Sequence, residues 1–188
     1  SEVFVPYLIS IIYLLVSELF LNNPDVIQNW SMTFMAQLYI ALPFASLNTL
    51  CMINTPNGVQ YYYWYALSLF IFLWSNDTGA YVFGSLLGKH KLFERISPKK
   101  TWEGSIGGGL TAIIASQIIA SFEPFTSTVS GIENNLLWAG LALLSVIIGT
   151  WGDLVESLFK RKVGIKDSGN ILPGHGGMLD RFDSSLIA

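Results

Sequence analysis

Long apolar runs, separated by short polar segments, dominate this chain and predict membrane-spanning helices. A helix needs roughly 20 predominantly apolar residues to cross a hydrocarbon core about 30 Å thick. Runs of suitable length predict spans over residues 3–21, 32–53, 61–88, 105–122 and 136–159, with a further helix starting near residue 180. The pattern therefore predicts an all-α integral membrane protein, a bundle of about five to six transmembrane helices with polar cytoplasmic loops.

Local signals support several of these boundaries. The polar sequence NNP at 22–24 follows the first run, and NTPNG at 54–58 closes the second with turn-forming residues. The third run opens on the aromatic cluster YYYWY at 61–65, which is typical of the membrane interface. No repeat or low-complexity linker divides the chain, so we expect one integral-membrane domain over residues 1–188. The chain begins without Met and ends in FDSSLIA, so we also expect it to be an excerpt of a longer protein.

Composition strengthens the membrane interpretation. Apolar residues make up 52% of the chain and charged residues only 12%, with a mean hydropathy of +0.49. Soluble domains carry roughly twice that share of charge, so each charged residue here needs a local explanation. The single cysteine, Cys51, permits no intramolecular disulfide and leaves the redox compartment open.

The placement of positive charge predicts an orientation. All ten Lys and Arg residues lie in two segments, 89–100 and 160–181, and the loop 123–135 between the fourth and fifth runs contains none. Two predicted crossings separate the basic segments, which places both on one face of the membrane. The positive-inside tendency makes that face cytoplasmic.

A polar stripe interrupts the fifth run. Asp153, Glu156, Ser157 and Lys160 follow the i, i+3, i+4, i+7 spacing of one helix face. A charge at the bilayer centre costs about 2.5–3.5 kcal/mol even on the lower scale, so the stripe is expected to face a wet cavity. Alternatively, Asp153 is solvated near the interface or pairs with Lys160.

Two further carboxylates, Asp180 and Asp183, are three residues apart. If a helix begins near Leu179, they share one face at about 5–6 Å between Cβ atoms and could hold a hard cation such as Mg²⁺. The alternative is a helix-capping pair beside a solvated Arg181.

Candidate phosphate-binding segments lie near these carboxylates. PGHGG at 173–177 offers backbone N–H groups and positive-φ freedom for an anion, although His175 could also be a simple turn residue. SPKKTWEG at 97–104 could bind phosphate through its lysines, or those lysines could only attract anionic head groups. Asn76 and Asp77, on the third run, could open the helix or accept a substrate hydroxyl, or form an interhelical hydrogen bond.

Glycines spaced four apart predict close helix packing, at Gly84 and Gly88 and again at Gly104 and Gly108. The same spacing is compatible with a homodimer. We favour the packing interpretation for these four positions.

Together these segments resemble a known family. SLFKRKVGIKDSGNILPGHGGMLDRFD at 157–183 is similar to the C-terminal signature of the phosphatidate cytidylyltransferases. NDTGAYVFG at 76–84, SPKKTWEGSIGG at 97–108 and GDLVES at 152–157 resemble other segments of that family, in the same order. Family members usually have further hydrophobic helices at one or both ends.

The resemblance implies a membrane-embedded catalytic domain that converts CTP and phosphatidate to CDP-diacylglycerol and pyrophosphate. It implies Mg²⁺, with room for a second metal ion, held by Asp153, Asp180 and Asp183, and a cytoplasm-facing site in a bacterial inner membrane. Membrane lipid is an expected partner and nucleic acid is not. The implied catalytic residues are Asp153, Lys166, Asp180 and Asp183. The implied substrate-binding residues are Asn76, Asp77, Lys99, Lys100, Thr101, Trp102, Lys160, Arg161, Asp167, His175, Gly176, Gly177 and Arg181.

Two alternatives remain open. A related transferase could use the same site on another lipid phosphate. An ion or proton transporter could use the intramembrane acids Asp77, Asp153 and Glu156, although the polar residues cluster toward one face instead of continuing through the membrane.

Overall fold

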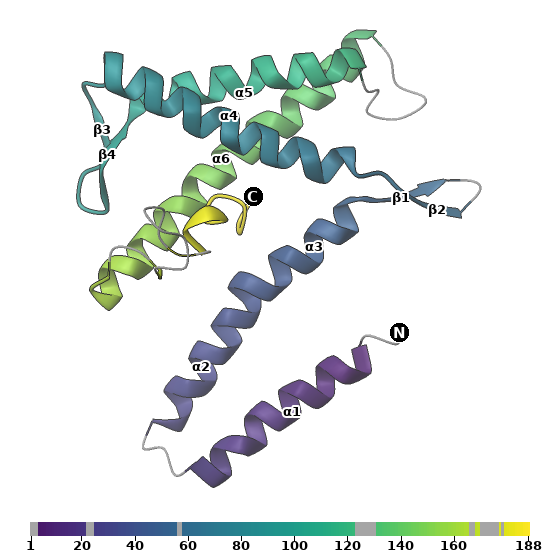
Figure 1. Ribbon diagram of the computed structural model, residues 1–188, viewed down its shortest axis with the longest axis vertical. Coiled ribbons are helices and arrows are strands. Elements are labelled where there is room, and N and C mark those ends of the chain that lie inside the picture. The colour runs from purple at the N-terminus through teal and green to yellow at the C-terminus, as the bar shows by residue number, and fades with distance from the viewer. Residues whose placement is uncertain are drawn as a thin grey trace. The chain divides into compact units, whose positions relative to one another are not determined.

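The computed structural model describes residues 4–21, 25–55, 58–122, 131–165, 168–169, 177 and 179–188. The chain divides into two compact units, residues 1–42 and 43–188, and each is presented by itself. Figure 1 traces the elements along the chain.

The first unit consists of α1 (Phe4–Leu21), α2 (Val26–Ala36) and a short π-helical turn, η1 (Gln37–Ala41). Asn29 of α2 donates a side-chain hydrogen bond to the Glu18 carboxylate of α1 at 3.3 Å. Glu18, the only charge in the first apolar run, therefore joins two helices. Apolar side chains of α1, such as Ile9 and Ile12, remain exposed, which suits a helix surrounded by lipid.

The second unit begins in α3 (Leu42–Leu50) and contains the remaining elements. These are β1 (Met52–Thr55), β2 (Gly58–Tyr61), α4 (Trp64–Leu87), β3 (Lys91–Phe93), β4 (Ser97–Thr101), α5 (Trp102–Phe122), α6 (Gly131–Val163) and the 3₁₀ turn η2 (Leu179–Arg181). By length and hydropathy, α5 and α6 could each cross a bilayer, and residues 5–21 form a shorter apolar helix.

The predicted helical character is confirmed, but two hairpins correct the all-α prediction. Strands β1 and β2 pair antiparallel, with Met52 opposite Tyr61. The helix of the second apolar run consequently ends at Leu50 and not at residue 53. Beyond it, the chain favours strand pairing because β-branched and aromatic residues fit a pleated surface.

The second hairpin orders a segment that was predicted to be a polar loop. Lys91 of β3 lies opposite Thr101 of β4. The Glu103 carboxylate, in the first turn of α5, accepts the backbone N–H of His90 at 3.2 Å and lies 2.6 Å from His90 Nδ1. The hairpin is thereby fastened to the start of α5, and Lys99 and Lys100 lie on a strand with a defined direction.

Helices α4 and α5 lie side by side (Figure 1), and glycines permit their close approach. A Cβ atom at Gly104 would lie 2.8 Å from the carbonyl oxygen of Ala80, and one at Gly108 would lie 2.5 Å from Asn76 Oδ1. The packing role predicted for these glycines is confirmed within the chain. The core beside this contact is built from Tyr65, Phe72, Ala112, Ile119, Ala120, Trp138, Ala142 and Val146.

The structure excludes one alternative for the third run and corrects one further expectation. Asn76 and Asp77 do not open the helix, because α4 is continuous from Trp64 to Leu87 and the buried Asn76 side chain packs against Gly108 of α5. No α-helix starts near residue 180 within residues 179–188, which form η2 followed by hydrogen-bonded turns.

Candidate active site

A polar cavity of about 200 Å³ lies where α4, β4, α5 and α6 meet. All four elements carry segments that the sequence singled out, and the fold brings together residues from 76 to 150. Five predicted substrate-binding residues line this polar cavity: Asn76, Asp77, Lys99, Lys100 and Thr101. The remaining lining residues are Ala80, Tyr81, Gly104, Ser105 and Thr150.

Thr101 sits at the junction between β4 and α5. Its side chain is buried, and its Oγ1 accepts the backbone N–H of Gly104 at 3.2 Å. A threonine in this position caps the helix N-terminus, satisfying one of its unpaired N–H groups. The cap fixes the end of the strand on which Lys100 precedes it.

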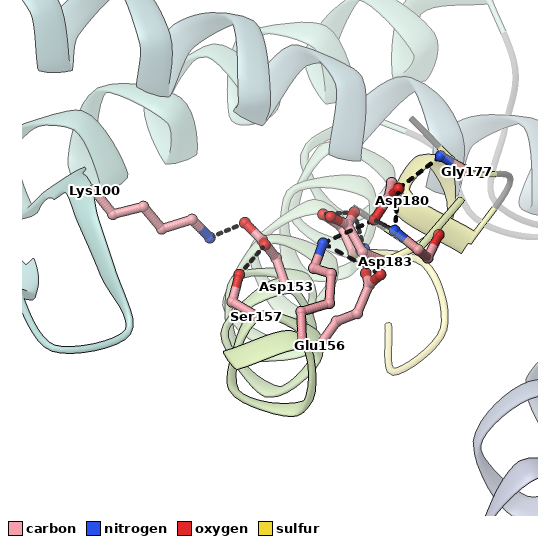
Figure 2. A network of polar contacts seen from close by, with 10 residues as sticks. Lys100, Asp153, Glu156, Ser157, Gly177, Asp180 and Asp183 are labelled. Carbon is pink, nitrogen blue, oxygen red and sulfur yellow. Dashed lines mark hydrogen bonds and ion pairs between the residues drawn. The ribbon is translucent and has the colours of Figure 1, made fainter. Parts of the chain in front are cut away.

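Lys100 connects the polar cavity to α6, because its ammonium forms an ion pair with the Asp153 carboxylate (Figure 2). Asp153 also accepts a hydrogen bond from Ser157 Oγ at 3.3 Å. This ion pair joins the first basic segment to the helix that carries the start of the second. The contact therefore places Lys100 of the first basic segment beside α6, seven residues before Lys160.

The sequence left open a pairing of Lys160 with Asp153, but in the structure Lys160 pairs with other carboxylates. Its Nζ lies 3.4 Å from Glu156 Oε1 and 2.9 Å from Asp180 Oδ1, while Asp153 takes Lys100. The polar stripe on α6 thus separates into an outer pair, Lys100 with Asp153, and an inner cluster in which Lys160 meets Glu156 and Asp180. Figure 2 shows the carboxylates of both groups.

Asp180 organises the chain around the glycine-rich segment. Besides the Lys160 bond, Oδ2 accepts the backbone N–H groups of Ser168 at 2.9 Å and Gly177 at 2.7 Å. Burial alone would raise the pKa of the Asp180 carboxyl, but Lys160 and the two backbone donors hold that pKa well below its usual range. Asp180 is therefore ionised, and it accepts hydrogen bonds from Lys160 of α6 and from the backbone at Ser168 and Gly177.

Asp183 is positioned by the packing of the terminal segment. The neighbouring Phe182 ring lies 5.5 Å from that of Phe44 and 6.2 Å from that of Phe70. On α6, a Cβ at Gly152 would lie only 3.1 Å from the Asp183 carbonyl oxygen, so glycine permits this close approach. Burial, followed by the charge of Asp153, raises the pKa of the Asp183 carboxyl.

The carboxylates meet the requirements of a metal ion only in part. Among the residues that the structure describes, no three His, Cys, Asp or Glu side chains gather where one ion could be held. The Asp180 carboxylate already accepts hydrogen bonds from Lys160, Ser168 and Gly177. The charge of Asp153 raises the pKa of Asp183, and Mg²⁺ usually takes one or two protein carboxylates together with substrate phosphates.

Several predicted site residues are not brought into this geometry. Trp102 is exposed and lines an adjoining apolar groove instead of the polar cavity. Arg161 is exposed at the end of α6. Gly177, in contrast, is brought into the site, because it is buried and its backbone N–H donates to Asp180. Outside the described residues lie Lys166, Asp167, His175 and Gly176, together with the side chain of Arg181.

The predicted site set omitted residues that the structure places beside it. Glu156 is only 1% exposed and pairs with Lys160. Its position in the polar stripe could have identified it as a site residue from the sequence. Thr150 and Tyr81 line the polar cavity. Thr150 precedes Asp153 by one helical turn, and Tyr81 follows Asp77 by one, so helical spacing from a predicted site residue could have identified both.

Comparison with known proteins identifies the same family that the sequence motifs resemble. Residues 3–188 match the family model described as the cytidylyltransferase family. A phosphatidate cytidylyltransferase of Staphylococcus saprophyticus is 49% identical over 126 residues, covering 65% of this chain and 45% of the relative. That of Staphylococcus aureus is 49% identical over 123 residues, with the same coverage of each chain.

A third similar protein is the phosphatidate cytidylyltransferase of Staphylococcus haemolyticus. It is 46% identical over 142 residues, covering 69% of this chain and 51% of the relative. The chain therefore spans about half the length of the curated relatives it matches.

Proposed function

This chain belongs to the cytidylyltransferase family, and from that premise we propose that it transfers CMP from CTP to phosphatidate, giving CDP-diacylglycerol and pyrophosphate. The observation that carries the proposal is the Lys100–Asp153 ion pair. It joins a lysine-lined polar cavity to the carboxylates of α6, so that phosphate-binding and metal-binding chemistry adjoin. The names of the similar staphylococcal proteins support this choice of reaction.

The reaction needs no nucleophile from the protein. A phosphate oxygen of phosphatidate attacks the α-phosphorus of CTP, a new phosphorus–oxygen bond forms, and the bond to the bridging oxygen of the β-phosphate breaks. Pyrophosphate leaves with that bonding electron pair. The obstacle is repulsion between two anionic substrates, and preorganised cations such as Lys99 and Lys100 offset it as negative charge shifts in the transition state.

Lys100 is suited to exchange between partners. Among the described residues its one carboxylate partner is Asp153, and it lines the polar cavity, so an arriving phosphate competes with Asp153 for the ammonium. Release of Asp153 would leave its carboxylate available beside Asp183. These two residues would hold Mg²⁺, and the bound ion would supply charge neutralisation and Lewis acidity.

The other predicted residues keep proposed roles. Asp180 and Lys160 position the glycine-rich segment through the Gly177 N–H, and that segment is the proposed phosphate cradle. The proposed cradle and its surroundings comprise Arg161, Lys166, Asp167, His175, Gly176 and Arg181.

The site is proposed to face the cytoplasm from a bacterial inner membrane, in a single domain with about five to six spans. The apolar helices α5 and α6 and the bacterial relatives support a membrane location. CTP would arrive from water and phosphatidate from the bilayer. Because the glycine motifs already pack α4 against α5, the proposed homodimer would use another surface.

The test is a pyrophosphate-release assay on the intact protein purified in detergent, with Mg²⁺ and labelled CTP, with and without phosphatidate. We expect release only with both lipid and metal, together with a lipid-soluble cytidine product. Asp183→Asn should abolish most of this activity, and Asp25→Asn, beside α2 in the first unit, should not. Faster turnover with another lipid phosphate, or counterflow in sealed liposomes without CTP, would replace the proposal with one of its rivals.

A further inference from the structure

An apolar groove of about 550 Å³ adjoins the polar cavity, between α5, α6 and β3. Pockets of roughly 300–1,000 Å³ with mostly apolar walls are typical ligand sites. Ser105 and Thr150 line both the polar cavity and this α5–α6 groove. The groove therefore opens from the place where the substrate phosphates are proposed to bind.

We propose that the α5–α6 groove holds an acyl chain of the lipid substrate and that Gly109 keeps the groove open for it. This inference rests on the proposed function, because it assigns the tail of a lipid whose phosphate occupies the polar cavity. Lys99 and Lys100 complement the negative head group at the polar end.

The dimensions of the groove match one leaflet of a bilayer. Along α5 its lining runs from Trp102, beside the polar cavity, to Ile113. At 1.5 Å per residue this is about 16 Å of helix, and half of a hydrocarbon core of about 30 Å is about 15 Å. An acyl chain anchored by its phosphate at the polar end would therefore lie along the groove without leaving its leaflet.

Aromatic residues mark the polar end as the level of the membrane interface. The Trp102 and Trp151 side chains line the groove there and are each 55% exposed. The Trp151 ring packs against Phe93 of β3 with centroids 5.9 Å apart. Tryptophans are enriched at the head-group level of membrane proteins, so the order along the groove is polar cavity, interfacial tryptophans and apolar tail.

Gly109 differs from the neighbouring glycines of α5. A Cβ at Gly107 would lie 2.3 Å from the Phe83 ring, and one at Gly108 would collide with Asn76, whereas one at Gly109 meets only Val146 Cγ1 at 3.9 Å. Helix packing therefore does not require glycine at 109. Since glycine costs about 1 kcal/mol relative to alanine inside a helix, its position on the groove wall is consistent with a role in leaving space for a ligand.

The experiment compares Gly109→Leu with Gly140→Leu in the intact protein. Gly140 lies on α6, where an added Cβ meets nothing within 4 Å, and it does not line the groove. We expect Gly109→Leu to raise KM for dipalmitoyl phosphatidate about tenfold, while KM for dihexanoyl phosphatidate and for CTP changes by less than about twofold. Gly140→Leu should leave all three KM values near those of the unchanged protein.

A binding measurement that does not depend on turnover accompanies the kinetics. Phosphatidate brominated on its acyl chains should quench the fluorescence of Trp102 and Trp151, and Trp151→Phe should remove part of that quenching. Equal changes in KM for the long-chain and short-chain lipids in Gly109→Leu, or equal quenching with and without Trp151, would overturn the proposal. So would a changed oligomeric mass without a chain-length effect, because another copy would then cover the groove.

The proposed function is tested separately by the unchanged protein. If it binds brominated phosphatidate with the expected quenching but forms no cytidine lipid, the proposed reaction fails and the groove assignment stands. If it turns over both lipids and neither variant shows a chain-length effect, the groove assignment fails and the reaction stands.

Discussion

Lys100 and Lys160 both pair with carboxylates of α6, but their surroundings differ. The Lys100 side chain is 27% exposed and its partner Asp153 is 24% exposed. Lys160 is 15% exposed and lies between Glu156 and Asp180, whose side chains are 2% and 11% exposed. The first pair borders the polar cavity, whereas the second is more buried and includes Asp180 of the terminal segment.

The difference in burial distinguishes an ion pair that a ligand can replace from one that stabilises the fold. A partly exposed ion pair contributes about 0–1 kcal/mol, because water screens it and can replace either partner. Removing one member of a buried pair leaves an uncompensated charge that water cannot reach. Similar lysine–carboxylate chemistry thus fits an exchangeable substrate contact at Lys100 and a fixed structural contact at Lys160.

The largest expected effect follows from removing the largely buried ammonium of Lys160. Lys160→Met leaves Glu156 and Asp180 buried without their shared ammonium and should lower the free energy of unfolding by about 3–5 kcal/mol. Thermal unfolding of the detergent-solubilised protein measures the change. Lys162→Met, at an exposed position on the same helical turn, is the matched control. Equal stability of the two variants would show that burial does not distinguish these lysines.

Substitution of the partly exposed Lys100 should have the opposite effect, with a small change in stability and a large change in activity. Lys100→Met is expected to change the free energy of unfolding by less than about 1 kcal/mol, yet to lower kcat/KM for CMP transfer about 100-fold, because a preorganised cation beside the phosphates is lost. Steady-state kinetics and unfolding are measured on one preparation. Lys91→Met, on β3 and outside the polar cavity, should retain activity. A large stability loss with intact kinetics would reverse the roles assigned to the two lysines.

The smallest effect concerns how Lys100 is placed. Thr101→Val removes the oxygen that accepts the Gly104 N–H and should cost about 1 kcal/mol of stability through loss of the helix cap. Thr78→Val provides the comparison, since Thr78 is exposed and its hydroxyl only donates to the Trp74 carbonyl one turn back. If both substitutions cost the same, Thr101 would not be acting as a cap, and the placement of Lys100 would need another explanation.

Local patterns in the sequence predicted most of the helical framework. Apolar runs and their polar ends anticipated α4, α5 and α6 to within several residues, because helix formation and burial depend on neighbours within a few turns. The spacing of Gly104 and Gly108 anticipated the close α4–α5 contact. The Asp153–Lys160 stripe followed from helical periodicity alone, and the ordered motifs from 76 to 183 indicated the family that the comparison then confirmed.

The β3–β4 hairpin was not predicted, because its strands are short and lack clear alternation of polar and apolar residues. The sequence also left open whether Asn76 and Asp77 open α4, because the answer depends on space supplied by Gly108 on another helix. Both features depend on partners elsewhere in the chain, which a scan of local periodicity does not include.

The sequence by itself determined which residues are apolar enough to form membrane helices and which charges had to be accounted for. The tertiary structure decided which charge meets which. Lys100 of β4 reaches Asp153 of α6, and Lys160 meets Asp180 from 20 residues away. It also decided that Ser105 and Thr150 join the polar cavity to the α5–α6 groove. Such pairings depend on the distance and rotation between packed elements, and no local pattern of residues specifies either quantity.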